Sequence, residues 1–310
     1  MNFAFAFPGQ GSQSVGMMAA YGDAAVVRDT FAQASAALGQ DLWALVAEGP
    51  ADLLNQTVNT QPAMLAAGVA VYRLWLDQGG RVPALMAGHS LGEYTALVCA
   101  GALDFADGVK LVRLRAEAMQ SAVPEGVGAM AAVLGLDDAA VLAVCAEAAQ
   151  GEVLEAVNFN SPGQVVIAGH KAAVDRGCVL AKEKGAKRAL PLPVSVPSHC
   201  ALMKPAADKL LAALDGIQVK APVVPVLHNA DVASHADPAA IRDALARQLY
   251  SPVRWVETVR AMAAGGIPLV AECGPGKVLA GLNKRIAEGV ASLALADAAG
   301  LTDLLTKTQD

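Results

Sequence analysis

A serine between two glycines is the strongest chemical signal in the sequence. Residues 88–92 read Gly-His-Ser-Leu-Gly and fit the G-x-S-x-G pattern, in which a tight strand-to-helix turn holds a serine at an exposed apex. The apolar run that begins at Leu85 predicts the strand before the turn, and the apolar spacing after it predicts a helix. A serine that only caps this helix would fit the same five residues. The flanking strand and helix favour Ser90 as a nucleophile.

A nucleophilic serine needs a base, and the chain contains few histidines. His89 adjoins the serine and is expected to point elsewhere, and three others lie in polar turns or at a strand end: His170, His235 and His228. His199 stands at a loop-to-helix junction downstream of Ser90, as the base does in α/β-hydrolases, and is the predicted base. No aspartate stands out on a strand end between them, so a backbone carbonyl is an alternative acceptor for its Nδ1–H. Cys200 is a rival nucleophile, although consecutive side chains diverge.

An arginine on an apolar side of a helix is the second signal. Asp104 is predicted to cap a helix on which Arg115 shares a side with three apolar residues, Leu111, Val112 and Met119. Arg115 is therefore expected to point inward, where an unpartnered cation is costly. Either it binds an anionic ligand, or Asp104, Asp107 or Glu117 pairs with it and it only ties the helix down.

The composition indicates a globular chain with a substantial core. Its 310 residues are 55% hydrophobic and 17% charged, which leaves room for one large domain or two unequal ones. The net charge of −6 argues against nucleic acid as the main partner. No apolar run approaches the roughly 18 residues of a membrane span. Five scattered cysteines without a C-x-x-C motif and a poor signal-peptide pattern favour the cytoplasm.

The order of expected elements predicts an α/β protein. Strands alternate with helices, which is typical of a mostly parallel sheet with helices on both faces. From residue 126 to 195 the order becomes βαββαβ, the ferredoxin-like pattern, and this stretch looks like an insertion. The predicted domains are therefore 1–125 with 196–310, and 126–195, with a substrate cleft between them. One helix is expected over residues 17–38, and another begins at Gln61-Pro62 and runs to about residue 77. A single last helix is expected after the loop at 273–276.

Several motifs together resemble those of one enzyme family. In chain order they are Pro8-Gly9-Gln10-Gly11-Ser12-Gln13, Thr60-Gln61-Pro62-Ala63, Gly88-His89-Ser90-Leu91-Gly92-Glu93-Tyr94, Arg115, Asn158-Phe159-Asn160-Ser161-Pro162, Pro197-Ser198-His199 and Gln248. With these motifs the chain resembles the malonyl-CoA:acyl-carrier-protein transacylases of bacterial fatty-acid synthesis over nearly its whole length. The resemblance implies an α/β-hydrolase-like large domain, with a mostly parallel sheet and an inserted ferredoxin-like small domain.

The resemblance also implies roles for the matching residues. Ser90 would accept the malonyl group, His199 would be its base, and the backbone carbonyl of Gln248 would hold the imidazole. The backbone N–H groups of Gln10 and Leu91 would form the oxyanion hole. Arg115 would bind the malonyl carboxylate, and the rest of the substrate site would comprise Asn160 near the pantetheine arm, Gln61 and Met119. Malonyl-CoA and acyl carrier protein are the implied partners, and no metal or cofactor is expected.

Other functions are possible for the same motifs. A serine thioesterase or esterase would use the same turn, but it has no need of an inward arginine. A transferase for methylmalonyl or another extender is a second alternative, although Leu91 favours malonyl by resemblance, and a non-catalytic docking module is a third. A monomer is the expected state. The carrier of this family is acidic, so it should meet one of the local basic clusters, Lys182, Lys184, Lys187 and Arg188, or Lys204, Lys209, Lys284 and Arg285.

Overall fold

The computed structural model describes residues 1–194 and 196–309, so Ser195, at the predicted domain boundary, lies outside the described residues. Its strands are β1 Ala4–Phe7, β2 Leu85–Gly88, β3 Gly128–Leu134, β4 Leu154–Ser161, β5 Gln164–His170, β6 Arg188–Pro191, β7 Val226–Leu227, β8 Leu269–Glu272 and β9 Ala291–Ala294. Its α-helices are α1 Ala25–Leu38, α2 Leu42–Glu48, α3 Ala51–Leu54, α4 Thr57–Asp77, α5 Leu91–Cys99, α6 Phe105–Gln120, α7 Asp138–Ala149, α8 Lys171–Glu183, α9 Lys204–Asp215, α10 Pro238–Gln248, α11 Trp255–Ala264, α12 Val278–Asn283 and α13 Ala298–Thr308. Two 3₁₀ turns, Ala19–Tyr21 and Ala201–Met203, complete the set.

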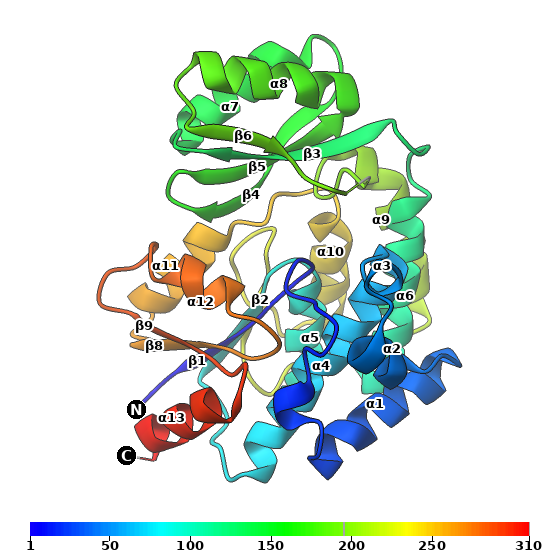
Figure 1. Cartoon of the computed structure of the whole chain (residues 1–310), viewed down its shortest axis with the longest axis vertical. Coiled ribbons are helices and arrows are strands. Elements are labelled where there is room, and N and C mark those ends of the chain that lie inside the picture. The colour runs from blue at the N-terminus through cyan, green and yellow to red at the C-terminus, as the bar shows by residue number, and fades with distance from the viewer. Residues whose placement is uncertain (195, 310) are drawn as a thin grey trace.

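The larger sheet is parallel and has the strand order β7-β2-β1-β8-β9. Its central strand β1 alternates phenylalanine with alanine, so the two residue types face opposite layers. Phe5 and Phe7 pack into the core formed with α4, where Trp75 meets Phe5 edge to face. On the other side the small Ala4 and Ala6 leave room for α11 and α12. The predicted parallel sheet with helices on both faces is confirmed (Figure 1).

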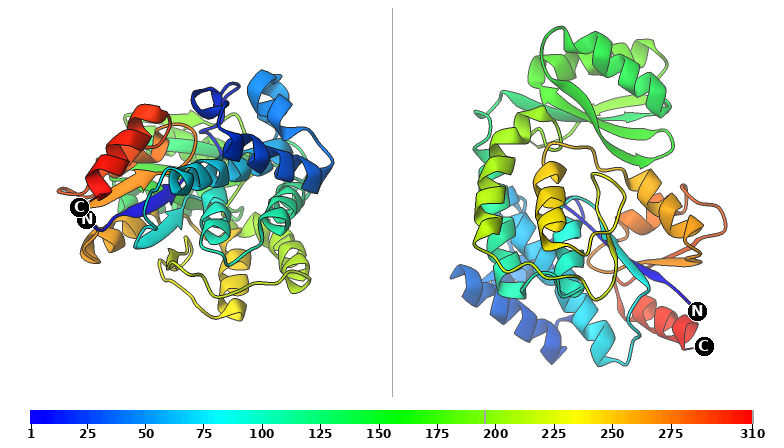
Figure 2. Two further views of the ribbon diagram at one scale, coloured as in Figure 1. Left: turned by 90° about the horizontal axis from the view of Figure 1, so that it is seen from below. Right: turned by 180° about the vertical axis from the view of Figure 1, so that it is seen from behind.

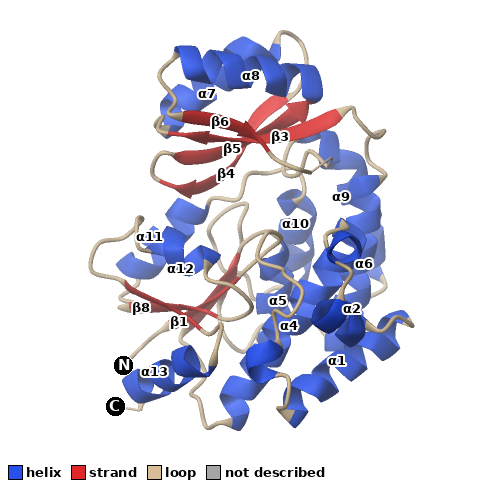
Figure 3. Cartoon of the chain, in the orientation of Figure 1, coloured by secondary structure: helices blue, strands red, loops and turns tan. Residues whose placement is uncertain are grey.

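The smaller sheet is antiparallel and has the strand order β4-β5-β3-β6. The chain order β3-α7-β4-β5-α8-β6 confirms the predicted ferredoxin-like βαββαβ pattern. Helices α7 and α8 cover its outer face (Figure 3). Met130 and Val166 on the other face pack against Cys200 of the larger domain. The backbone of β4 also bonds the larger domain, because the Phe159 N–H donates to the Val253 carbonyl at 3.0 Å.

Two helix predictions were wrong in their bounds. The expected helix over 17–38 is broken by a turn at Gly22 and Asp23, both weak helix formers, and Ala24 before α1 is extended. Helix α4 begins at Thr57, so Pro62 lies inside it and does not open it. A hydrogen bond to α3 fixes the first turn of α4, because the Thr60 hydroxyl donates to the carbonyl of Leu54 at 2.6 Å.

The C-terminal segment also differs from the prediction of one last helix. After α12 the chain adds the edge strand β9, paired in parallel with β8, and then α13. Asp297 caps α13 by accepting a hydrogen bond from the Gly300 N–H at 2.9 Å. Both chain termini lie side by side at this edge of the molecule (Figures 1 and 2). None of the helices in the described part of the chain is long and apolar enough to cross a membrane.

Candidate active site

The turn between β2 and α5 has the geometry of a nucleophile elbow. Ser90 at its apex has φ 51° and ψ −109°, a backbone conformation that residues other than glycine rarely adopt. A Cβ atom on Gly88 would lie 1.8 Å from the carbonyl carbon of Gly92, and one on Gly92 would lie 2.0 Å from the Phe7 oxygen. Both glycines are therefore required, because strand, turn and helix approach too closely for any side chain.

His199 lies beside the serine, as expected of its base. Its Nε2 atom is 2.8 Å from Ser90 Oγ, and its Nδ1 atom is 2.8 Å from the backbone carbonyl oxygen of Gln248. Since the carbonyl only accepts, Nδ1 carries the proton and Nε2 is left to accept from the serine. Burial, and then the nearby Arg115 cation, lower the pKa of His199 to about 3. The imidazole is therefore neutral at physiological pH and ready to take a proton.

The other histidines are engaged elsewhere. His89 Nε2 is 2.8 Å from Asn160 Oδ1, so its ring turns from Ser90 toward the small domain. His170 accepts a hydrogen bond from the Val153 N–H. His228 bonds Glu93, and His235 bonds Asp231. The thiol of Cys200 faces the Pro197 carbonyl at 3.1 Å, and burial raises its pKa to about 12. Cys200 is therefore a poor rival for the nucleophile.

Arg115 points inward and is fully buried. Its Nη1 donates to Gln61 Oε1 at 2.8 Å, and its Nη2 donates to Gln248 Oε1 at 3.0 Å and to Ser90 Oγ at 3.2 Å. Its Nε has no hydrogen-bond partner among the described groups. Asp104 instead caps α6, and no carboxylate in the described part of the chain pairs with this guanidinium. The alternative of a purely structural ion pair is therefore wrong.

A cavity of about 360 Å³ opens in front of the serine and is lined from both domains. Its lining residues are Gln10, Asn55, Gln56, Thr57, His89, Ser90, Gln120, Met130, Asn158, Leu192, Pro193, Val194, Val196, Ser198 and His199. Asn160 reaches this cavity only through His89. Gln61 and Met119 lie behind Arg115, with Gln61 Nε2 3.9 Å from Met119 Sδ. The cavity thus lies between the two domains, and of the predicted site residues Gln10, Ser90 and His199 line it. The four predicted substrate-binding residues stand behind that lining: Arg115, Asn160, Gln61 and Met119.

Two buried residues beside Ser90 are absent from the sequence-based site. Asn229 Oδ1 accepts from the Ser90 N–H at 2.7 Å, and its Nδ2 donates to the Gly88 carbonyl at 2.6 Å. Glu93 is fully buried and accepts from the Asn229 N–H at 2.8 Å. One signal for Glu93 was present in the sequence, since it is the single charged residue of the otherwise uncharged helix α5.

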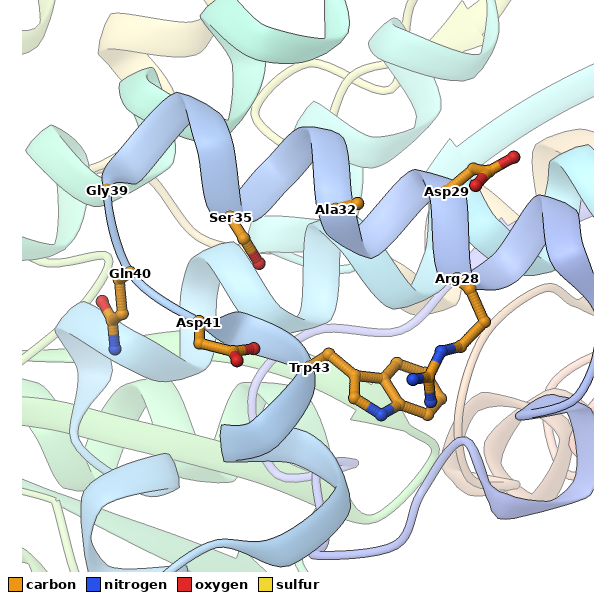
Figure 4. Close-up of a pocket in the computed structure, with 8 residues that line it drawn as sticks. All are labelled: Arg28, Asp29, Ala32, Ser35, Gly39, Gln40, Asp41 and Trp43. Carbon is orange, nitrogen blue, oxygen red and sulfur yellow. The ribbon is translucent and has the colours of Figure 1, made fainter.

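A second cavity, of about 600 Å³, lies between α1 and α2 (Figure 4). The Arg28 guanidinium stacks on the Trp43 ring at 4.0 Å there, and none of the predicted site residues lines it. The acidic side chains in Figure 4 are Asp29 and Asp41, and the Asp41 carboxylate accepts from the Ala44 N–H as the cap of α2. This cavity holds no base next to a nucleophile, so the chemistry belongs to the Ser90 site.

A neutral histidine beside a strained elbow serine, on an α/β-hydrolase-like sheet, defines the class of serine-dependent acyl-transfer enzymes. Residues 4–302 match the family model described as the acyl transferase domain. Over 306 residues, 98% of this chain and 99% of the relative, the sequence is 61% identical to the malonyl CoA-acyl carrier protein transacylase of Salmonella typhimurium. The chain belongs to the malonyl-CoA:acyl-carrier-protein transacylase family.

Solved structures agree with this assignment. The acyl-carrier-protein S-malonyltransferase of Burkholderia pseudomallei is 61% identical and superposes with a TM-score of 0.98, over 99% of this chain and 100% of that one. A malonyl-transacylase solved in complex with its type II polyketide synthase acyl-carrier protein is 56% identical, again with a TM-score of 0.98, covering 99% of this chain and 100% of that one. The predicted two-domain fold, α/β-hydrolase-like with a ferredoxin-like insertion, is therefore confirmed.

Proposed function

We propose that this chain moves a malonyl group from malonyl-CoA to the pantetheine thiol of acyl carrier protein through an ester on Ser90. The observation that carries the proposal is the grouping of Ser90 Oγ, 2.8 Å from a neutral histidine nitrogen and 3.2 Å from an arginine without a carboxylate partner. The first pair activates a nucleophile, and the arginine supplies a site for an acyl group that ends in a carboxylate.

The first half-reaction makes the malonyl ester. His199 Nε2 takes the Ser90 proton as Oγ attacks the thioester carbon, and the resulting oxyanion is held by the backbone N–H groups of Gln10 and Leu91. Neither amide donates a hydrogen bond to another described group, and Leu91 opens α5, whose N-terminal dipole favours negative charge. The imidazolium then returns its proton to the coenzyme A sulfur as the C–S bond breaks.

The second half-reaction reverses these roles with a new thiol. His199 accepts the proton of the carrier's pantetheine thiol, whose sulfur attacks the malonyl ester, and Ser90 Oγ leaves with that proton. One thioester is exchanged for another, so the proposed cycle needs no redox partner, metal ion or cofactor bound by this chain. The two substrates use one cavity in turn, which predicts ping-pong kinetics.

Arg115 is proposed to choose the acyl group. The Nε of its guanidinium has no partner among the described groups, and Nη2 donates to Gln248 Oε1 at 3.0 Å and to Ser90 Oγ at 3.2 Å. A substrate carboxylate can therefore bind Nε and replace the longer Ser90 contact at Nη2. A malonyl group attached to Ser90 brings its carboxylate to these donors. An acetyl group would leave the arginine buried without that partner. This difference favours malonyl transfer over acetyl transfer and over simple ester hydrolysis.

The acceptor behind His199 suits a transferase. A backbone carbonyl orients the imidazole but has no full negative charge to stabilise the imidazolium, in contrast to the aspartate of a hydrolase triad. His199 should therefore be a weaker base toward water. The malonyl ester can then survive until the carrier thiol arrives.

The carrier protein must approach a chain of net charge −6, so a local basic patch is proposed to receive it. Several candidate cations already have partners: Lys184 pairs with Glu147, and Lys209 donates to Ser121. Arg285 donates to Gln164 of β5 at 2.9 Å, which places Arg285 next to the small domain. Both candidate clusters can be tested by charge reversal against the holo carrier.

We also infer a cytoplasmic monomer. All five cysteines are free thiols, and four of them are buried, which suits a reducing compartment. Light scattering coupled to gel filtration tests the monomer, for which the expected mass is 31.5 kDa. A mass twice that value would contradict it.

Intact-protein mass spectrometry tests the reaction directly. Incubation with malonyl-CoA should add one malonyl group, and peptide mapping should place it on Ser90. Addition of holo carrier protein should then remove the adduct and load the carrier. Rapid release of free malonate without carrier would indicate a hydrolase instead.

A further inference from the structure

We propose that Glu93 is a positioning residue that sets the preference for malonyl by orienting the Gln248 side chain against Arg115. The inference rests on the proposed function, because it concerns the arginine assigned there to the substrate carboxylate. Glu93 contacts neither that arginine nor the reacting atoms. It acts through an amide that lies between a buried anion and a buried cation.

Glu93 meets three partners from two parts of the chain, residues 228–229 and the end of α10. Its Oε2 accepts from Gln248 Nε2 at 2.8 Å and from the Asn229 N–H at 2.8 Å, and its Oε1 lies 2.7 Å from His228 Nδ1. The carboxylate and the imidazole are both fully buried. These contacts fix the Gln248 side-chain amide directly and hold the backbone of Asn229, whose side chain accepts from the Ser90 N–H.

The orientation of the Gln248 amide follows from these contacts. Its Nε2 donates both to Glu93 and to the Ser90 carbonyl at 2.9 Å, so its Oε1 must face the other way, toward Arg115 at 3.0 Å. If the carboxylate were absent, the amide could rotate and present its NH₂ group to the guanidinium. Two donors would then face each other, and Arg115 would move.

The charges favour this indirect arrangement. His228 meets Glu93 through Nδ1, and its Nε2 has no hydrogen-bond partner among the described groups. The buried cation Arg115 lies on the far side of the Gln248 amide from Glu93. A direct ion pair between them would occupy the carboxylate-binding edge of the guanidinium. The intervening amide orients the arginine through one bond to Nη2 and leaves the Nε donor for the substrate.

The test compares malonyl-CoA and acetyl-CoA as donors in the acylation of the full chain, measured as rates of adduct formation. Glu93→Gln should lower malonyl acylation about tenfold or more and acetyl acylation much less, so the malonyl-to-acetyl ratio falls. Glu93→Asp, which keeps the charge, should recover part of the ratio. Glu272→Gln is the matched control, since Glu272 is the other fully buried glutamate and binds the Ala280 N–H outside the site. Its ratio should equal that of the wild type.

A double-substitution cycle separates positioning from general support of the fold. Gln248→Met removes the amide but keeps the backbone carbonyl that holds His199, and it should lower the ratio by itself. Adding Glu93→Gln to Gln248→Met should then change the ratio little, because the amide that links Glu93 to Arg115 is already absent. Ratios that multiply independently, or a ratio unchanged in either single variant, would overturn the proposal.

The outcomes also distinguish this inference from the proposed function. If Arg115→Ala leaves the ratio unchanged, the assignment of the arginine to the malonyl carboxylate fails. If Arg115→Ala lowers the ratio but Glu93→Gln reduces both donors equally, only the positioning role fails. Should Glu93→Gln not fold, as judged by its thermal melt, Gln248→Met alone decides the matter, and an unchanged ratio there contradicts the proposal.

Discussion

The core under the antiparallel sheet and the region around Ser90 are both well buried, but they bury different side chains. Between that sheet and helices α7 and α8 the cluster is wholly apolar, with residues such as Val144, Ile167 and Val174. Among residues 126–194 the buried polar side chains are Asn158 and Ser161, both on β4. Around Ser90, by contrast, an acid, a cation, two histidines and two amides are buried together: Glu93, Arg115, His199, His228, Asn229 and Gln248.

This difference indicates where stability and chemistry are located. Apolar burial is non-directional, so the small domain can tolerate modest changes of side-chain shape. Buried polar groups must satisfy one another in fixed directions, and each lost partner leaves another group unpaired. Substitutions around Ser90 should therefore change activity by large factors, and substitutions in the small-domain core should chiefly change stability.

The largest effect is expected at the dyad. Ser90→Ala should abolish the malonyl adduct, and His199→Ala should slow its formation about a thousand-fold or more, because among the described residues no other base reaches Ser90 Oγ. Stopped incubations analysed by intact mass measure both, and circular dichroism checks folding. An adduct that persists in Ser90→Ala and maps to Cys200 would overturn the assignment.

The next effect is expected at Arg115. Arg115→Ala should lose malonyl transfer by about a hundred-fold, on the order of 3 kcal/mol for a charged hydrogen-bonded pair. Arg115→Ala should use acetyl-CoA as well as the wild type does, or better. Arg115→Lys should also be poor at malonyl transfer, since a point charge cannot reproduce the guanidinium fork. Steady-state transfer to the holo carrier measures all three. Equal losses for malonyl and acetyl would show that this arginine only supports the fold.

The pH profile gives a smaller contrast. Because burial and Arg115 lower the pKa of His199 to about 3, the base remains neutral at pH 5, and acylation should be nearly as fast there as at pH 7. For a histidine with its ordinary pKa of about 6.5, the neutral fraction, and with it the acylation rate, would fall about 25-fold over that range. The rate constant for malonyl-adduct formation between pH 5 and 8 is the measurement. An acid limb centred near 6.5 would contradict the prediction.

The same lowered pKa has a consequence for stability. Below about pH 6.5 His199 is protonated in the unfolded chain but stays neutral in the folded chain. The free energy of unfolding should therefore fall as the pH drops. His199→Gln should weaken this dependence. Urea unfolding at pH 5 and pH 7.5, in both proteins, is the comparison.

The smallest effect on activity is expected in the small-domain core. Ile167→Val removes one methyl group from the fully buried face of β5 and should cost about 1 kcal/mol of folding free energy. Malonyl transfer should remain within about twofold of wild type, because no polar partner is lost. Chemical denaturation and transfer assays on one preparation measure both. A large loss of activity with unchanged stability would remove the distinction between the two regions.

Much of the fold was predictable because its signals are local. The Phe–Ala alternation of β1, the glycines around Ser90 and the cap at Asp104 each depend on neighbouring residues alone. The ferredoxin-like order over β3 to β6 followed from the same kind of pattern. The edge strand β9 was missed because it is short and only partly buried, and its pairing with β8 is a tertiary contact.

The site was predictable to the extent that motifs mark it. The sequence by itself determined the elbow serine, its histidine base and the inward side of α6 that carries Arg115. The resemblance added that Gln248 supplies the carbonyl behind the histidine. The sequence could not place Met119 and Gln61 behind the arginine, because residue type alone does not say whether a side chain lines a cleft or supports a residue that does.

Only the tertiary structure decided how the polar groups meet. Glu93 and Gln248 are 155 positions apart in the chain, and their contact depends on α5 and α10 arriving at the same side of the parallel sheet. The direction of an amide and the missing carboxylate partner of Arg115 are properties of that packing, since a hydrogen bond requires a definite distance and angle. Residue type indicates which groups can bond; the fold determines which of them do.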